Sequence, residues 1–206
     1  MKNILLIICS LFLIINASAQ DKGIINNADS KQVKFKSIDI GDCQWTEGFW
    51  ADKWKICEEV MVPHMGKLLT GDVGHALNNF KIAAGEKEGK HQGMSWHDGD
   101  FYKWMEASIY IYAVNKDKAI LKEMDEYIEI IGKAQEDDGY LSTQITLRED
   151  RTKFENRRFH ELYNSGHLLT SACIHNRVTG QENFLKIAIK HADYLYKTFQ
   201  PQPKEL

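Results

Sequence analysis

The chain has 206 residues, which is enough for one domain with a sizeable core, and its formal net charge is −3. A mildly acidic chain without a basic cluster is a poor match for nucleic acid or an anionic membrane surface, so we expect neither partner. Beyond the apolar amino-terminal stretch, the three cysteines Cys43, Cys57 and Cys173 form no CxxC pair. Their pattern indicates neither a disulfide framework nor a metal site, and we expect Cys57 and Cys173 to be small buried residues.

Residues 1–19 predict a secretory signal peptide. They combine a positive start, an almost entirely apolar run over 4–15 and a small-residue Ala-Ser-Ala cleavage signature. Because the apolar run is too short for a comfortable membrane span, we expect an exported protein, periplasmic or extracellular, with no membrane contact after cleavage. Residues 20–44 predict a flexible leader, in which an alternating pattern over 33–40 indicates one short strand.

Residues 45–206 form one predicted domain, in which the apolar pattern is helical apart from one long loop. The predicted helices cover about 47–69, 75–84, 98–114, 117–136, 158–178 and 182–199. Pro63 should bend or split the first helix, because proline lacks the backbone N–H that the helix needs. Short turns join the last four helices into two antiparallel hairpins, and the long charged loop over 142–158 is of a kind that is usually functional or disordered. This pattern predicts an all-α fold, an incomplete (α/α)6 barrel of about six helices paired in hairpins.

The segment HELYNSGHLL sets polar side chains along one face of the fifth predicted helix. On a helical wheel with about 100° per residue, one narrow face collects His160, Asn164, His167 and Ser171, flanked by Tyr163. A solvent-facing helix would carry Lys and Glu there. Imidazoles, an amide and hydroxyls instead favour a wet, concave pocket that hydrogen-bonds a neutral polar ligand.

Asp98 and Asp100 lie at the start of the third predicted helix, among aromatic residues. Carboxylates ringed by aromatics can bind sugar hydroxyls while Trp or Tyr stacks on the C–H face of the sugar ring. Aspartates at a helix start also cap the helix and favour its positive end, and for either residue alone that structural role is the commoner one. Both interpretations remain open at this point.

The sequence matches none of the common metal-binding or nucleophile motifs considered below. The sequence from His160 to Asn164 is similar to the zinc-protease HExxH motif, but Asn164 replaces the second histidine. His160 and His167 are seven residues apart, which is too far for the usual i, i+4 chelate. Neither GxSxG nor a glycine-rich phosphate loop occurs, so the residues alone indicate no nucleophile–base pair.

Five short motifs occur in the same order and at fitting spacings in one known family. They are Gly48-Phe49-Trp50-Ala51-Asp52; Leu77-Asn78-Asn79-Phe80 with Ala83-Ala84-Gly85; Asp98-Gly99-Asp100 leading to Lys103-Trp104-Met105-Glu106-Ala107; Ala134-Gln135 leading to Asp138-Gly139-Tyr140-Leu141; and His160-Glu161-Leu162-Tyr163 with Gly166-His167-Leu168. Through these motifs, residues 45–199 resemble the amino-terminal part of glycoside hydrolase family 127, the β-L-arabinofuranosidase-like proteins.

The resemblance implies an (α/α)6 barrel and the removal of L-arabinofuranose from glycans with retention of configuration. In that family a zinc-bound cysteine is the nucleophile and a glutamate is the acid/base, and zinc keeps the sulfur as a thiolate. The family's zinc site, nucleophile and glutamate correspond to positions downstream of this chain. We therefore expect no catalytic residue and no cofactor within these 206 residues, and no glycosidase activity from the chain alone.

The resemblance also assigns a sugar-binding wall. The family's HELY histidine faces the sugar at the bottom of the pocket, and it maps onto His160. Tyr163, His167, Asp98 and Asp100 are further substrate-binding candidates around it. The implied protein is a truncated glycoside hydrolase whose partner is an L-arabinofuranose-containing glycan.

Two other functions stay open. The chain could be a non-catalytic exported helical module that binds saccharide or protein. It could also be another α/α-toroid sugar enzyme, of the unsaturated glucuronyl hydrolase or epimerase type, in which His160 and Asp100 act together. In each case the apolar faces of an incomplete barrel predict self-association.

Overall fold

The computed structural model describes residues 30–35 and 37–200. The chain divides into two units, Met1–Cys43 and Gln44–Leu206, and every described helix belongs to the second. The described residues form helices and loops only, which confirms the predicted all-α class. The predicted signal peptide lies outside them.

The short strand predicted over 33–40 is absent from the residues described there, and residue 36 lies outside the description. The alternating pattern alone does not produce a strand, because a strand needs a partner to pair with. The described part of the chain offers no second strand.

The helix predicted over about 47–69 is divided next to Pro63, as expected. It consists of α2 (Phe49–Ile56), a π-helical turn η1 (Cys57–Met61) and α3 (Val62–Thr70), which has Pro63 in its first turn. Proline removes one helical hydrogen bond and its ring crowds the carbonyl one turn earlier. The wider π turn just before Pro63 accommodates both effects without ending the helix.

The next hairpin follows the predicted boundaries closely. After α4 (Ala76–Ala83), α5 (His97–Asn115) and α6 (Lys118–Ala134) pack as an antiparallel pair. Lys116 takes the left-handed conformation that ends α5, with φ 58°. The Asp117 side chain then accepts a hydrogen bond of 2.9 Å from the Ala119 N–H and so caps α6.

The charged loop predicted over 142–158 contains two short helices, α7 (Thr143–Thr146) and the 3₁₀ turn η2 (Arg157–Phe159). It leads into the second hairpin, α8 (Glu161–Thr179) and α9 (Asn183–Phe199). Gly180 ends α8 in the left-handed conformation, with φ 75°. None of the helices in the described part combines the length and the apolar character that a membrane span requires.

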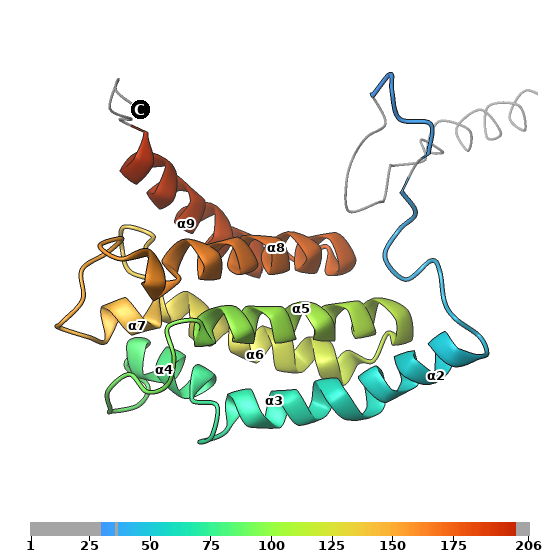
Figure 1. Cartoon of the computed structure of the whole chain (residues 1–206), viewed down its shortest axis with the longest axis horizontal. Helices are drawn as coiled ribbons and strands as arrows, with labels where there is room; N and C mark the ends of the chain where they lie inside the picture. Colours follow the sequence, from blue (N-terminus) through green and yellow to red (C-terminus); the bar gives the residue numbers. More distant parts are fainter. Residues whose placement is uncertain (1–29, 36, 201–206) are drawn as a thin grey trace, which may run out of the picture. The chain divides into compact units, whose positions relative to one another are not determined.

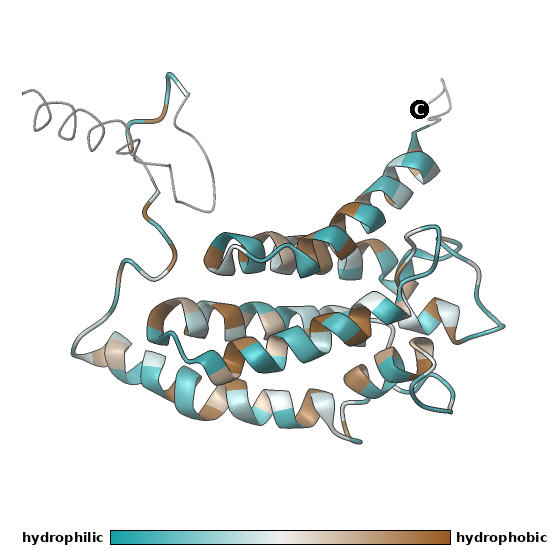
Figure 2. Cartoon of the chain, turned by 180° about the vertical axis from the view of Figure 1, so that it is seen from behind, coloured by the Kyte–Doolittle hydropathy of each residue, from teal (hydrophilic) through white to brown (hydrophobic). Residues whose placement is uncertain are grey.

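Within the second unit, α5 and α8 lie side by side and run in the same direction, each followed by its antiparallel partner (Figure 1). Hydrophobic and hydrophilic bands alternate along these helices (Figure 2). The side chains with almost no solvent exposure include Phe80, Phe101, Tyr102, Met105, Ile109, Met124, Ile128, Ile131, Leu168 and Phe184. This core holds α5 and α8 rigidly, so the side chains at their neighbouring amino-terminal ends have fixed positions.

Candidate functional site: the amino-terminal ends of α5 and α8

A cavity of about 220 Å³ lies at the start of α8. Its lining is largely apolar and consists of Phe154, Asn156, Arg157, His160, Glu161, Leu162, Tyr163 and Phe199. Two of the predicted site residues, His160 and Tyr163, are therefore on the wall of one cavity.

The backbone sets the position of His160. This residue stands at the N-cap of α8, in the left-handed conformation with φ 60° and ψ 21°. Its carbonyl accepts a hydrogen bond of 2.8 Å from the Asn164 N–H, and its ring meets the edges of Trp96 and Tyr163 at centroid distances of 5.3 and 5.7 Å. The sequence predicted a place inside the helix, whereas the structure places His160 just before it.

The Arg158 carbonyl determines which nitrogen of the His160 ring carries the proton. Nδ1 lies 2.6 Å from the carbonyl oxygen of Arg158. A carbonyl only accepts hydrogen bonds, so Nδ1 carries the proton, and in the neutral ring Nε2 has a lone pair free to accept. His160 can therefore accept a hydrogen bond from a ligand hydroxyl.

Tyr163 joins this cavity to a charged pair on α5. The Lys103 ammonium donates to the Tyr163 hydroxyl at 3.0 Å and to Asp100 Oδ1 at 2.7 Å. Because the Tyr163 oxygen already accepts from Lys103, its own hydrogen is free to be donated to a ligand. The sequence analysis missed Lys103, although its i, i+3 spacing from Asp100 was visible.

His167 completes this cluster. Its ring packs edge-on against Tyr163 with a centroid distance of 4.7 Å. Partial burial and the positive charge of Lys103 lower the pKa of His167, while Asp100 opposes them. Thus His160, Tyr163, His167 and Asp100 are gathered around the adjacent ends of two helices.

Asp98 does not join them. It is 2% exposed, and its two carboxylate oxygens accept hydrogen bonds from the Thr143 N–H and hydroxyl at 2.8 and 2.6 Å. Burial raises the pKa of Asp98 to about 6, against the lowering effect of those two bonds. In this structure Asp98 ties α7 to α5 and presents no oxygen to a ligand, which corrects the expected position on the pocket wall.

The predicted polar stripe on α8 is also divided. Asn164 and Ser171 are buried against α5, where Asn164 accepts from the Gly99 N–H at 3.2 Å and Ser171 donates to the Tyr102 carbonyl at 2.9 Å. Their polarity satisfies backbone groups between two closely packed helices, so the expectation that they face a pocket is wrong. Cys173, expected to be buried, is exposed, and Cys57 is only half-buried.

Glu161 positions the loop that forms the far wall of the cavity. Its carboxylate accepts a hydrogen bond of 2.8 Å from the Phe154 N–H and another from the Tyr140 hydroxyl. Burial raises the pKa of Glu161, and those hydrogen bonds together with Lys153 oppose the shift. Glu161 was not among the predicted sugar-binding residues, although it lies inside the HELY motif.

The described residues do not fit a zinc–thiolate site. Among residues 30–35 and 37–200, no three His, Cys, Asp or Glu side chains converge as metal ligands. The contact recorded for the Cys57 sulfur is Met61 Sδ at 4.0 Å, which is not a zinc donor set.

Comparison with known proteins gives a consistent result. Residues 42–206 match the family described as "Beta-L-arabinofuranosidase, GH127 catalytic domain". A curated relative, the non-reducing end β-L-arabinofuranosidase of Bifidobacterium longum subsp. longum, is 36% identical over 142 residues. The matched stretch is 66% of this chain and 22% of that relative.

Solved structures of the same family also match the chain. A GH127 β-L-arabinofuranosidase from Geobacillus stearothermophilus T6 matches with a TM-score of 0.72 and 36% identity, over 75% of this chain and 25% of that one. A second GH127 β-arabinofuranosidase matches with a TM-score of 0.67 and 32% identity, over 75% and 26%. The predicted fold, an incomplete α/α barrel, is thereby confirmed, and the chain spans about a quarter of the length of these relatives. The chain thus belongs to glycoside hydrolase family 127, with residues 42–206 matching its β-L-arabinofuranosidase catalytic domain.

Proposed function

We propose that this chain forms part of the sugar-binding wall of a glycoside hydrolase that acts on L-arabinofuranosides. The observation that carries the proposal is the cavity at the start of α8, lined by His160 and Tyr163, in a chain of the GH127 family. Its volume of about 220 Å³ is below the ~300–1,000 Å³ of pockets for drug-sized ligands, which suits one sugar ring.

Each polar group has a defined role in this proposal. His160 Nε2 accepts a hydrogen bond from one sugar hydroxyl, and the Tyr163 hydroxyl donates to another oxygen of the sugar. His167 and Asp100 hold Tyr163 and Lys103 in place through the contacts described above. Phe199 and Phe154, which line the same cavity, offer apolar faces to the C–H side of the ring.

In this proposal the described residues recognise the sugar, and none of them cleaves the glycosidic bond. An ordinary glycosidase mechanism requires a pair of carboxyl groups, whereas Glu161 is the one carboxyl group among the described residues that line the cavity. We therefore propose that the described residues bind sugar and that the chain alone does not hydrolyse it. A glycan substrate also agrees with the proposed export of the protein.

The test is calorimetric titration of the purified chain with methyl β-L-arabinofuranoside. We expect saturable binding, and we expect His160→Ala to weaken it at least tenfold, because a buried sugar hydroxyl then lacks its acceptor. His64→Ala, at an exposed position on α3, is the matched control and should bind like the wild type.

Two outcomes would contradict the proposal. One is the absence of binding to the wild-type chain under conditions where its helical circular dichroism is intact. The other is equal weakening by His160→Ala and His64→Ala. Turnover of 4-nitrophenyl β-L-arabinofuranoside by the chain alone would overturn the narrower statement that it carries no catalytic groups.

A further inference from the structure

A second, larger cavity of about 410 Å³ lies between α3 and α5. Its lining is largely apolar and comes from the π-helical turn, α3 and one face of α5, namely Cys57, Met61, Val62, Met65, Leu69, Asp100, Lys103, Trp104 and Ala107. Sulfur-containing side chains form much of one wall.

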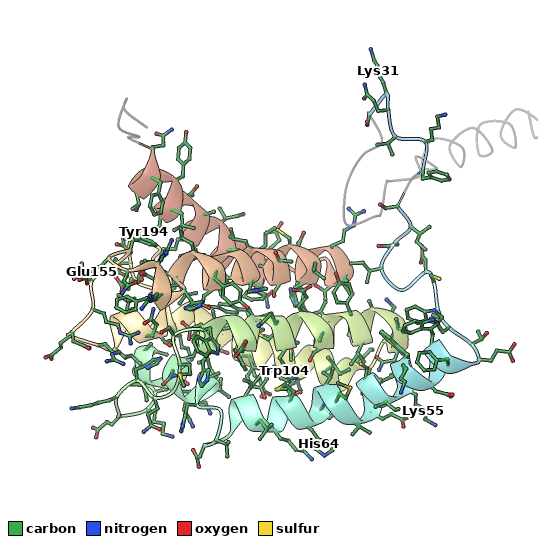
Figure 3. The ribbon with its side chains drawn as sticks, viewed as in Figure 1. Lys31, Lys55, His64, Trp104, Glu155 and Tyr194 are labelled. Carbon is green, nitrogen blue, oxygen red and sulfur yellow. The ribbon has the colours of Figure 1, made fainter. Side chains whose placement is uncertain are left out.

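The floor of this cavity is rigid. The Trp104 indole lies between α5 and α3 (Figure 3), and its Nε1–H donates to the Val62 carbonyl at 2.8 Å. The indole packs so closely on Gly66 that a Cβ there would lie 2.5 Å from it. By contrast, Met61 and Met65 on the outer wall are 58% and 49% exposed. Flexible methionines above a fixed aromatic floor form a surface that adapts to apolar groups of different shapes.

One hydrogen-bonded pair of side chains links the linings of the two cavities. Lys103 lies on the edge of the apolar cavity and Tyr163 on the wall of the His160 cavity, and their polar ends are 3.0 Å apart. A ligand with a sugar in the first cavity and an apolar group reaching over this pair would occupy both. Asp100 and Lys103 are the charged groups at the apolar cavity, and because they neutralise each other, an uncharged group fits beside them.

We infer that the cavity between α3 and α5 holds the apolar part of an amphiphilic glycoside, that is, an alkyl or aryl aglycone attached to the arabinofuranose. This inference rests on the proposed function, which places the sugar beside His160. It narrows the substrate class from L-arabinofuranosides in general to those whose aglycone has an apolar surface. Sites for small molecules usually have an apolar lining with a few polar groups, and this cavity has that composition.

The test compares methyl and hexyl β-L-arabinofuranoside by calorimetric titration of the full chain. We expect the hexyl glycoside to bind at least tenfold more tightly, because burial of only two methylenes is worth about that factor. Its binding should also show the more negative heat-capacity change of apolar burial. Met65→Lys, which places a charge on the outer wall, should reduce hexyl binding to the level of methyl binding and leave methyl binding unchanged.

Leu68→Lys is the matched control. Leu68 is 47% exposed on the same helix and is not part of the cavity lining, so this variant should keep the preference for the hexyl glycoside. Equal affinity of the wild type for both glycosides, or equal effects of the two lysine variants, would overturn the inference and leave the sugar site standing. Absence of binding to either glycoside would overturn the proposed function as well. If Met65→Lys abolished self-association but left hexyl binding intact, the cavity would be an interface with a second copy, and the inference would be wrong.

Discussion

Asp98 shows how one buried carboxyl group makes the folding equilibrium depend on pH. Its folded-state pKa is raised from 3.8 to about 6 by burial, so between these values the folded chain binds more protons than the unfolded chain. The free energy of unfolding therefore falls as the pH rises through this window, by an amount on the order of 2–3 kcal/mol. Above about pH 6 the two bonds to Thr143 stabilise the charged carboxylate.

We predict that Asp98→Asn is at least as stable as the wild type at pH 7.5. The amide oxygen can accept from the Thr143 N–H, and the amide nitrogen can donate to the Thr143 hydroxyl, so both bonds survive without a buried charge. Urea unfolding at several pH values should show the advantage of the variant growing between about pH 4 and pH 6. Asp117→Asn, at the exposed cap of α6, should show no such gain.

A loss of more than about 1 kcal/mol in Asp98→Asn at pH 7.5 would contradict this account, because it exceeds the ordinary net value of one hydrogen bond. It would mean that the negative charge itself holds α7 against α5.

Side-chain roles were predictable from the sequence only in part. The HELY motif predicted His160 and Tyr163 as sugar-binding residues, and the structure places both on the lining of one cavity. The helical wheel also grouped Asn164 and Ser171 with His160, but a wheel does not say which neighbouring helix covers a face. Both residues turned out to satisfy backbone groups of α5.

At the scale of elements, the contact between α3 and α5 depends on one glycine. Gly66 is buried, and a Cβ at this position would lie 2.5 and 2.9 Å from two ring atoms of Trp104. The indole cannot move away easily, because its Nε1–H is bonded to the Val62 carbonyl.

We predict that Gly66→Ala destabilises the chain by about 1–3 kcal/mol, the usual cost of overpacking. Gly166→Ala is the control, because Gly166 also lies in a helix but no atom comes within 4 Å of its added Cβ. That variant should gain about 0.5–1 kcal/mol through helix propensity. Thermal unfolding of the two proteins checks both signs, and a Gly66→Ala protein as stable as the wild type would mean that α3 is not held against α5.

The helix boundaries were predictable because local chemistry fixes them. Asp117 caps α6, Gly180 ends α8, and Pro63 forces the change of helix type at η1. By contrast, α7 has only four residues, which is too short for a helical pattern of apolar residues to be seen in the sequence. Its position depends on a contact with Asp98 of α5, which lies far away in the sequence. The loop over 142–158 was therefore predicted only as a long functional or disordered segment.

At the scale of the whole molecule, α2, η1 and α3 expose many apolar side chains. Outside the lining of the cavity between α3 and α5, those at least 44% exposed include Phe49, Trp50, Ile56, Val60 and Leu68. A surface with this many exposed apolar groups on one helical stretch favours association, because burying it removes apolar area from water.

We predict concentration-dependent self-association of the purified chain. In sedimentation velocity, the weight-average sedimentation coefficient should rise between about 2 and 100 µM, the range in which weak interfaces associate. Trp50→Glu should suppress this rise, whereas Lys55→Glu, which alters an already polar position on α2, should not. A single monomeric boundary at all concentrations would contradict the prediction.

The central claim is that the His160 imidazole and the Tyr163 hydroxyl bind the same arabinofuranose ring. A crystal structure of the chain with methyl β-L-arabinofuranoside tests it most directly. We expect the sugar in the cavity at the start of α8, with oxygens at about 2.6–3.2 Å from His160 Nε2 and from the Tyr163 hydroxyl. A sugar bound elsewhere on the chain, or a His160 ring turned away from a sugar in that cavity, would contradict the account.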